Sequence, residues 1–220
     1  MARPSSSPRP SAPEASRGRL LEAAVALFGE RGYAATGVGA ICERAGIART
    51  ALYHHFGSKE GLLAEVIEHA GTAWIERLQK RVYLESETED RIAALLRGWI
   101  EIAQESPNLW RLPLVAQLEQ AGRSARVRDA LDRLWTRAER ALAEGIEDTL
   151  GRPLADLDLL AGTVIWGMQA TMLRQTTRPD PARLERELAE LARTLKLAVW
   201  IRLPYDVQRA VHALDAPEAP

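Results

Sequence analysis

The 220 residues are 46% hydrophobic and 27% charged, the balance of an ordinary soluble globular protein. No apolar run approaches the roughly 20 residues that span a bilayer, which argues against an integral membrane protein. The opening MARPSSSPRPSAPEAS lacks the apolar segment of a secretory signal. With Cys42 as its single cysteine, the chain has no disulfide framework, and we expect a cytoplasmic protein.

The net charge of −1 hides an uneven distribution along the chain. Residues 1–60 hold eight basic side chains against five acidic ones, whereas the remainder is acidic overall. A basic front on an acidic body is typical of an N-terminal surface that meets polyanions.

Helical periodicity extends over nearly the whole chain, and no strand-like alternation persists. The pattern predicts an all-α protein of about nine helices. They are expected at about 17–31, 38–45, 48–55, 58–82, 86–106, from 107 to an early break at Pro113, 125–150, 155–177 and 181–203. Residues 1–15 and 204–220 lack periodicity and are predicted to form a disordered arm and a flexible tail.

Several helix ends carry recognisable signals. Gly32 is predicted to end the first helix in a left-handed conformation, with Tyr33 folding back on the last turn. Ser58 and Asp180 precede helical patterns and are predicted to cap them.

Two short predicted helices joined by Gly46 match a helix-turn-helix, whose second helix lies in the major groove of DNA. Ile47 and Leu52 are expected to be the apolar anchors of this second helix, and Phe56 is expected to close its end. The residues left to face outward are Arg49, Thr50, Ala51, Tyr53 and His54. Such side chains can bond base edges or phosphates. Lys59 adds positive charge at a helix start that already favours anions.

The adjacent histidines His54 and His55 raise the alternative of a metal or catalytic site. Neighbouring residues on a helix point about 100° apart and cannot converge on one ion. We therefore expect no metal, with His54 facing outward and His55 packed inward. That Tyr53 is a half-exposed core residue stays open as an alternative.

The segment RLLEAAVALFGERGYAATGVGAICERAGIARTALYHHFGSKEGLL resembles the N-terminal domain of the tetracycline-repressor (TetR) family of transcriptional regulators. The resemblance covers about residues 18–66, with the LFxxxGY helix end, the IxxxAG turn and the LYxHFxSKExL block. It implies an all-helical homodimer with an N-terminal helix-turn-helix domain and a C-terminal helical domain for ligand binding and dimerisation. Carried over by position, the DNA contacts fall on Thr36, Arg49, Thr50, Tyr53, His54 and Lys59.

Three positions depart from the family pattern. Gly37 and Gly39 stand where relatives often place a hydroxyl and a basic residue, and Ala48 replaces a common serine cap. These departures weaken the case for some phosphate contacts and predict a looser start for the recognition helix.

With the resemblance, the domains are expected at 16–62 for DNA binding and 63–203 for ligand binding and dimerisation. In this family the last two long helices form a four-helix bundle with their partners. The segment 157–174 is apolar on more than one face, so one side can pack the body and the other a partner. The predicted dimer-interface residues are Leu160, Val164, Met168, Leu188, Leu191 and Leu195.

All six tryptophans lie beyond residue 60. They indicate either plain core or a cavity with flat aromatic walls, the usual composition of an apolar ligand site. The predicted ligand-binding residues are Trp99, Trp110, Gln117, Trp166, Gln169 and Met172. No basic cluster accompanies them, so we expect a hydrophobic or aromatic effector.

The sequence therefore predicts a transcriptional repressor, released from a palindromic operator in double-stranded DNA when a small molecule binds. A ligand-independent DNA-binding regulator or an activator is the alternative. An enzyme is not expected, because the body offers only His69 and His212, no cysteine and no nucleophile motif. No metal or other cofactor is predicted.

Overall fold

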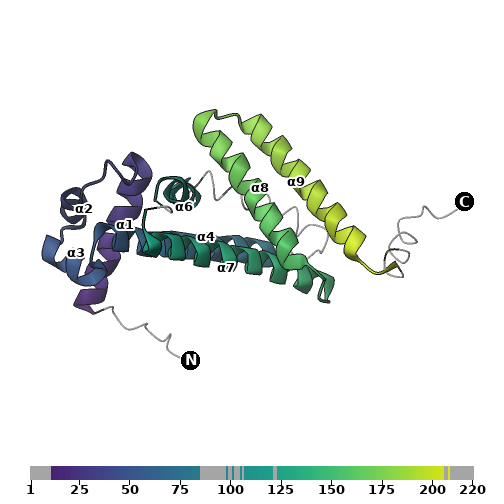
Figure 1. The fold of residues 1–220 in the computed structure, drawn as a ribbon, viewed down its shortest axis with the longest axis horizontal. Coiled ribbons are helices and arrows are strands. Elements are labelled where there is room, and N and C mark those ends of the chain that lie inside the picture. Colours follow the sequence, from purple (N-terminus) through teal and green to yellow (C-terminus); the bar gives the residue numbers. More distant parts are fainter. Residues whose placement is uncertain are drawn as a thin grey trace, which may run out of the picture. The chain divides into compact units, whose positions relative to one another are not determined.

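The structure, a computed structural model, describes residues 11–84, 107–120 and 123–205, together with 98, 101, 105 and 208. These residues contain helices and no strand, which confirms the all-α prediction. The helices are α1 (Ala12–Arg31), α2 (Val38–Ala45), α3 (Arg49–Phe56), α4 (Lys59–Leu84), α6 (Pro107–Gln120), α7 (Ala125–Leu150), α8 (Leu157–Thr177) and α9 (Pro181–Arg202) (Figure 1). The helix predicted at 86–106 and most of both predicted termini lie outside the described residues.

The described residues fall into two compact units. The first holds α1, α2, α3 and α6, with α4 up to Ala73 and α7 up to Leu134. The second holds the rest of α4 and α7, with α8 and α9. Within the described ranges, no helix is both long enough and apolar enough to cross a membrane.

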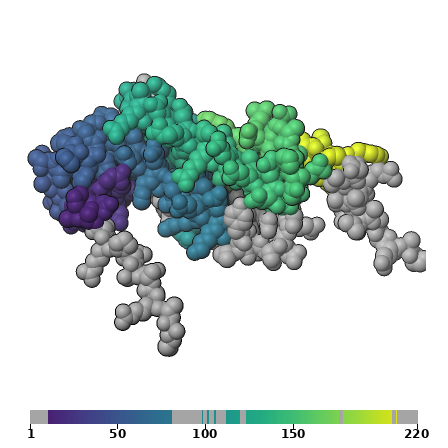
Figure 2. Space-filling view, turned by 90° about the horizontal axis from the view of Figure 1, so that it is seen from below, coloured from purple at the N-terminus to yellow at the C-terminus, as the bar shows by residue number. Residues whose placement is uncertain are grey.

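The first unit is larger than the predicted DNA-binding domain of residues 16–62, because α6 packs on α1 and joins the helix-turn-helix. In Figure 2 the blue surface of the N-terminal helices lies directly against the teal surface of α6 and α7. The functional boundary at residue 62 is a separate question and stays a prediction.

The core of the first unit forms where α1, α2 and α3 meet. Leu20 of α1, Ile41 of α2 and Leu52 of α3 have no exposed surface. Burying a Leu, Ile or Phe side chain contributes about 1.5–3 kcal/mol, so a few such residues stabilise short helices that would not form alone.

The predicted positions of these helix ends are confirmed. Gly32 ends α1 with a positive φ of 80°, but its ψ of 163° differs from the left-handed helical conformation that was predicted. Its N–H donates to the carbonyl of Phe28, and the ring of Tyr33 lies 5.5 Å from that of Phe28. The Ser58 hydroxyl accepts from the N–H of Gly61 at 3.0 Å. The Asp180 carboxylate accepts from the N–H of Arg183 at 2.9 Å.

Two predicted boundaries were wrong. α1 begins at Ala12 rather than near residue 17, because Ser11 and Glu14 form a capping box that overrides the low-complexity composition. The spacing Ser-x-x-Glu was the signal for this start. α6 continues through Pro113, where a break was predicted. Pro113 and its neighbours Leu112 and Leu114 are buried, and this packing offsets the one missing backbone hydrogen bond.

In the second unit, α8 and α9 pack against each other, and most of the predicted dimer-interface residues are already buried within the single chain. The sixth predicted interface residue, Leu191, is half-buried and lies beside Gly167. The other five are at most 8% exposed within one chain: Leu160, Val164, Met168, Leu188 and Leu195. The strongest apolar stripes thus fill the interior of the chain itself. The large apolar side chains that α8 and α9 expose are instead Leu159, Trp166, Leu197 and Ile201.

Candidate nucleic-acid interface

The turn between α2 and α3 is held by Gly46. This residue adopts φ 63° and ψ 37°, a left-handed conformation that favours glycine, and its N–H donates to the carbonyls at the end of α2. The N–H of Ile47 then donates to the carbonyl of Cys42 at 3.0 Å. These contacts fix the direction in which α3 leaves α2, as a helix-turn-helix requires.

The helix α3 has a buried face and an exposed face. Leu52 and Phe56, one turn apart, are 0% and 1% exposed. Arg49, Thr50 and His54 are exposed, and Tyr53 has 51% of its surface free, so its ring is accessible on the same side of the helix. Ala51 is half-buried between the two faces. The predicted outward set is therefore gathered on one accessible side of α3, apart from Ala51.

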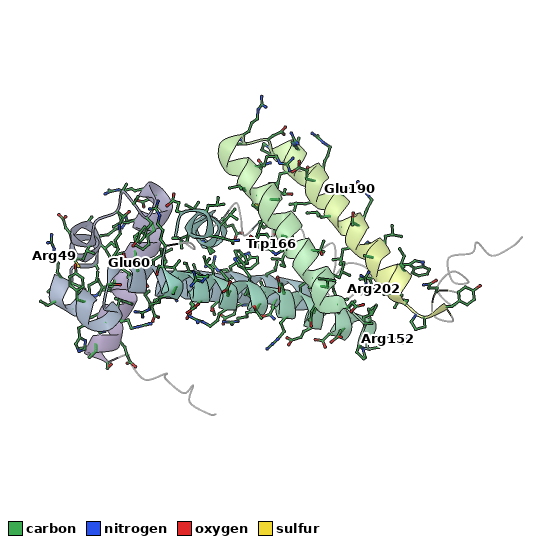
Figure 3. The ribbon with its side chains drawn as sticks, viewed as in Figure 1. Arg49, Glu60, Arg152, Trp166, Glu190 and Arg202 are labelled. Atoms are coloured by element: carbon green, nitrogen blue, oxygen red, sulfur yellow. The ribbon has the colours of Figure 1, made fainter. Side chains whose placement is uncertain are left out.

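The guanidinium of Arg49 lies over Gly39 of α2. A Cβ atom on Gly39 would stand 2.5 Å from Nη2 and 3.3 Å from Cζ of Arg49. Figure 3 shows Arg49 at the outer edge of this helix pair. Burial raises the pKa of the nearby Cys42 thiol, and the positive charge of Arg49 opposes that rise. The glycine that departs from the family pattern thus makes room for the first residue of α3.

Neither short helix has a side-chain cap at its start. Gly37 and Ala48 occupy the N-cap positions of α2 and α3 in extended conformations, and neither has a side-chain oxygen to offer the first amides. The looser start predicted for the recognition helix is consistent with this missing cap and stays a prediction.

Thr36 corrects the predicted DNA contacts. Its side chain is 1% exposed, and its hydroxyl donates to the carbonyls of Leu27 at 3.1 Å and Gly32 at 2.8 Å. These carbonyls belong to the last turn of α1 and to its C-cap residue. The Thr36 hydroxyl therefore closes α1 and is withdrawn from any surface that could meet DNA.

Lys59 is tied to the end of α1. Its ammonium donates to the carbonyl of Tyr33 at 2.6 Å and lies 4.1 Å from the centre of the Tyr33 ring. Burial lowers the pKa of Lys59. Burial, followed by the charge of Glu60 and its hydrogen bond, raises the pKa of Tyr33 to about 12. Since an ammonium has three N–H donors, the Tyr33 contact leaves capacity for a phosphate.

The two histidines occupy different environments. His54 is exposed, whereas His55 is half-buried with its ring centre 6.0 Å from that of Phe56. Their own rings are nearly perpendicular, at 83°. In the part of the chain that the structure describes, no group of three His, Cys, Asp or Glu side chains could hold a metal ion.

The predicted ligand-binding residues that the structure describes belong to both units. Gln169 and Met172 lie one turn apart on a buried face of α8, whereas Trp166 of the same helix is 52% exposed in the single chain, and its role in ligand binding stays a prediction. Gln117 is half-buried in α6, in the first unit. Trp99 and the side chain of Trp110 lie outside the described residues. A cavity of about 290 Å³ opens between α1, Leu63 and α6, and its described lining includes neither Gln117 nor the predicted residues of α8.

Comparisons with known proteins agree with this geometry. Residues 20–66 match the model of the "Bacterial regulatory proteins, tetR family". The chain is 30% identical to the HTH-type transcriptional repressor KstR2 of Mycobacterium tuberculosis over 155 residues, covering 66% of this chain and 73% of the relative. It is 31% identical to the HTH-type transcriptional repressor Rv3405c of the same species over 161 residues, which cover 73% of this chain and 77% of the relative.

Solved structures share the fold. A protein assigned to the TetR family from Mesorhizobium loti superposes with a TM-score of 0.72 at 22% identity, covering 86% of this chain and 98% of that one. The regulatory protein TetR from Rhodobacter sphaeroides superposes with a TM-score of 0.66 at 23% identity, covering 81% of this chain and 97% of that one. With the helix-turn-helix and the curated relatives, these findings show that the chain belongs to the TetR family of bacterial transcriptional regulators, DNA-binding proteins rather than enzymes.

Proposed function

We propose that the chain is a sequence-specific repressor that binds a palindromic operator as a homodimer and is released by a small molecule. The observation that carries this proposal is the exposed side of α3. Arg49, Thr50, Tyr53 and His54 share that side, while Leu52 and Phe56 anchor the helix from behind. This combination allows a helix to enter the major groove without losing its own packing.

Repression is favoured by the relatives that match along most of their length, KstR2 and Rv3405c, which are both named repressors. A shorter match of 96 residues is to FasR of Mycolicibacterium smegmatis, which is named an activator. Activation is therefore the second candidate. A promoter fused to a reporter gene distinguishes the two, because deleting a repressor raises expression and deleting an activator lowers it.

The exposed apolar residues of α8 and α9 support a homodimer. Leu159, Trp166, Leu197 and Ile201 are between 52% and 74% exposed in the single chain. Side chains of this size are seldom left clustered on a monomer surface, and a symmetric partner would cover them. We assign the dimer contact to these four residues in place of the buried stripe predicted from the sequence.

Gln169 supports a small-molecule effector. Its side chain is 4% exposed, and neither its amide nitrogen nor its carbonyl oxygen has a hydrogen-bond partner within the described part of the chain. A buried amide without partners costs about 1–3 kcal/mol, and a bound ligand with a donor and an acceptor would recover that cost. The effector we propose therefore joins an apolar body to one polar group.

The Gln169→Leu variant tests this role. Removing an unpaired buried amide should raise the free energy of unfolding by about 1 kcal/mol. The same variant should no longer release DNA in response to compounds that act on the wild-type protein. Urea unfolding and a DNA-release assay measure the two effects; a variant that is less stable and still responsive would contradict the assignment.

Selection from a library of random DNA duplexes tests the proposed function as a whole. The purified wild-type chain should enrich one sequence composed of two inverted half-sites about 10 base pairs apart between centres, one helical turn. Failure to enrich any sequence over several rounds would contradict it. A single half-site would contradict the dimer alone.

A further inference from the structure

Arg126, in the first turn of α7, reaches the end of the recognition helix. Its Nη1 donates to the carbonyl oxygen of Phe56 at 3.2 Å, across 70 positions of the sequence. Phe56 is the last residue of α3, so its carbonyl has no donor within the helix. An arginine at such a helix end satisfies the carbonyl, and its positive charge is favoured by the helix dipole.

A small charged cluster surrounds this contact. Glu65 of α4 pairs with Arg17 of α1 and lies 3.9 Å from Nη2 of Arg126. The Arg17 guanidinium lies 5.6 Å from the centre of the Phe56 ring. One carboxylate thus holds two arginines, of which one covers the ring of Phe56 and the other binds its carbonyl.

The start of α4 leaves space for the guanidinium. A Cβ atom on Gly61 would stand 2.6 Å from Nη1 of Arg126 and even closer to the carbonyl oxygen of Phe56. Real Cβ atoms do not approach so closely, so any larger residue at position 61 would displace one of them. The close approach of α3, α4 and α7 therefore depends on glycine at this position.

We propose that Arg126 is a positioning residue for DNA binding: it fixes the end of α3 without itself touching DNA. The exposed side chains of Arg49, Tyr53 and His54 move with that helix, so its end contact sets their direction. Because α7 continues to Leu150 in the second unit, a displacement of α7 changes the support at the end of α3. This inference rests on the proposed DNA-binding function.

The test uses the Arg126→Gln variant and the duplex selected by the wild-type chain, with a scrambled duplex of equal length. Affinity for the selected duplex should fall on the order of tenfold, since a hydrogen bond from a charged donor is lost. Affinity for the scrambled duplex should not change. The dependence of log affinity on log salt should keep its slope, because a lost phosphate contact would reduce it by about 0.9.

Arg123→Gln is the matched control, since it removes the same charge from the exposed turn just before α7. It should leave the ratio of specific to non-specific affinity unchanged. Hydrogen exchange gives a second readout. The amide of Gly57 donates to the backbone carbonyl of Tyr53 at 2.9 Å and should exchange faster in Arg126→Gln. Core amides of α1 should keep their wild-type exchange rates. If Arg126→Gln does not fold, Arg126→Lys keeps the charge and should show a smaller loss with the same salt slope.

Three results would contradict either the positioning role of Arg126 or the proposed DNA-binding function itself. A salt slope reduced by about one unit would show that Arg126 binds a phosphate directly, which overturns the positioning role. Equal affinity and equal exchange in Arg126→Gln and Arg123→Gln would also overturn it. If the wild-type chain enriches no duplex at all, the proposed function itself is contradicted.

Discussion

The two ends of the recognition helix α3 are held in different ways. At its start, Ala48 provides no side-chain acceptor, and the Arg49 side chain lies over Gly39 of α2. At its end, Phe56 is buried, the N–H of Gly57 closes the last turn, and Arg126 binds the final carbonyl from a distant part of the chain. The start therefore depends on local sequence alone, whereas the end depends on the fold of the whole first unit.

The Gly61→Ala variant should break the well-held end and gives the largest expected effect. The added Cβ would collide with the Phe56 carbonyl and with Arg126, so we expect a loss of about 1–3 kcal/mol in the free energy of unfolding. Urea unfolding followed by circular dichroism measures it.

Gly18→Ala is the control for this substitution. No atom lies within 4 Å of a Cβ built on Gly18, and the residue is within α1. Alanine there should stabilise the protein by roughly 0.5–1 kcal/mol through helix propensity. If both variants change stability in the same direction, the close packing at Gly61 is not the cause.

The Ala48→Ser variant should repair the weak start. Ala48 is exposed and already has the extended conformation of an N-cap, so a serine hydroxyl can accept from the first amides of α3. We expect a gain of about 1 kcal/mol in the free energy of unfolding. Ala51→Ser, within the same helix, should instead lose a few tenths of a kcal/mol; equal effects would rule out capping.

The smallest expected effects come from the adjacent histidines, which separate the exposed side of α3 from its buried side. His54→Ala removes an exposed side chain from the DNA-facing side, so binding to the selected duplex should weaken about fivefold with unfolding unchanged. His55→Ala removes a half-buried ring beside Phe56 and should lower stability by about 0.5–1 kcal/mol with a smaller effect on binding. Binding titrations and thermal unfolding of both variants measure the difference, and interchanged results would reverse the assignment of the two rings.

Sequence reasoning succeeded where neighbouring residues decide the structure. The bounds of α2, the stop at Gly32 and the cap at Asp180 all follow from residues within one helical turn. The outward side chains of α3 also follow from spacing, because Leu52 and Phe56 fix the buried face.

The errors arise where distant contacts decide. Pro113 stays helical because α6 is packed against α1, and the hydroxyl of Thr36 is taken up by carbonyls of α1. The apolar stripe of α8 was assigned to a partner, yet its residues are already buried within the single chain. No local pattern marks Arg126, since its acceptor lies 70 positions earlier in the chain.

The central claim is that the exposed side of α3 reads base pairs. The most direct test repeats the duplex selection with Arg49→Ala, Thr50→Ala and Tyr53→Ala, using Arg152→Ala, an exposed arginine of the second unit, as the control. We predict that at least one of the α3 variants loses its preference at the same base pair in both half-sites, where a good contact contributes about 1–3 kcal/mol of discrimination. Sequence preferences that stay identical to the wild type in all three variants would contradict the claim.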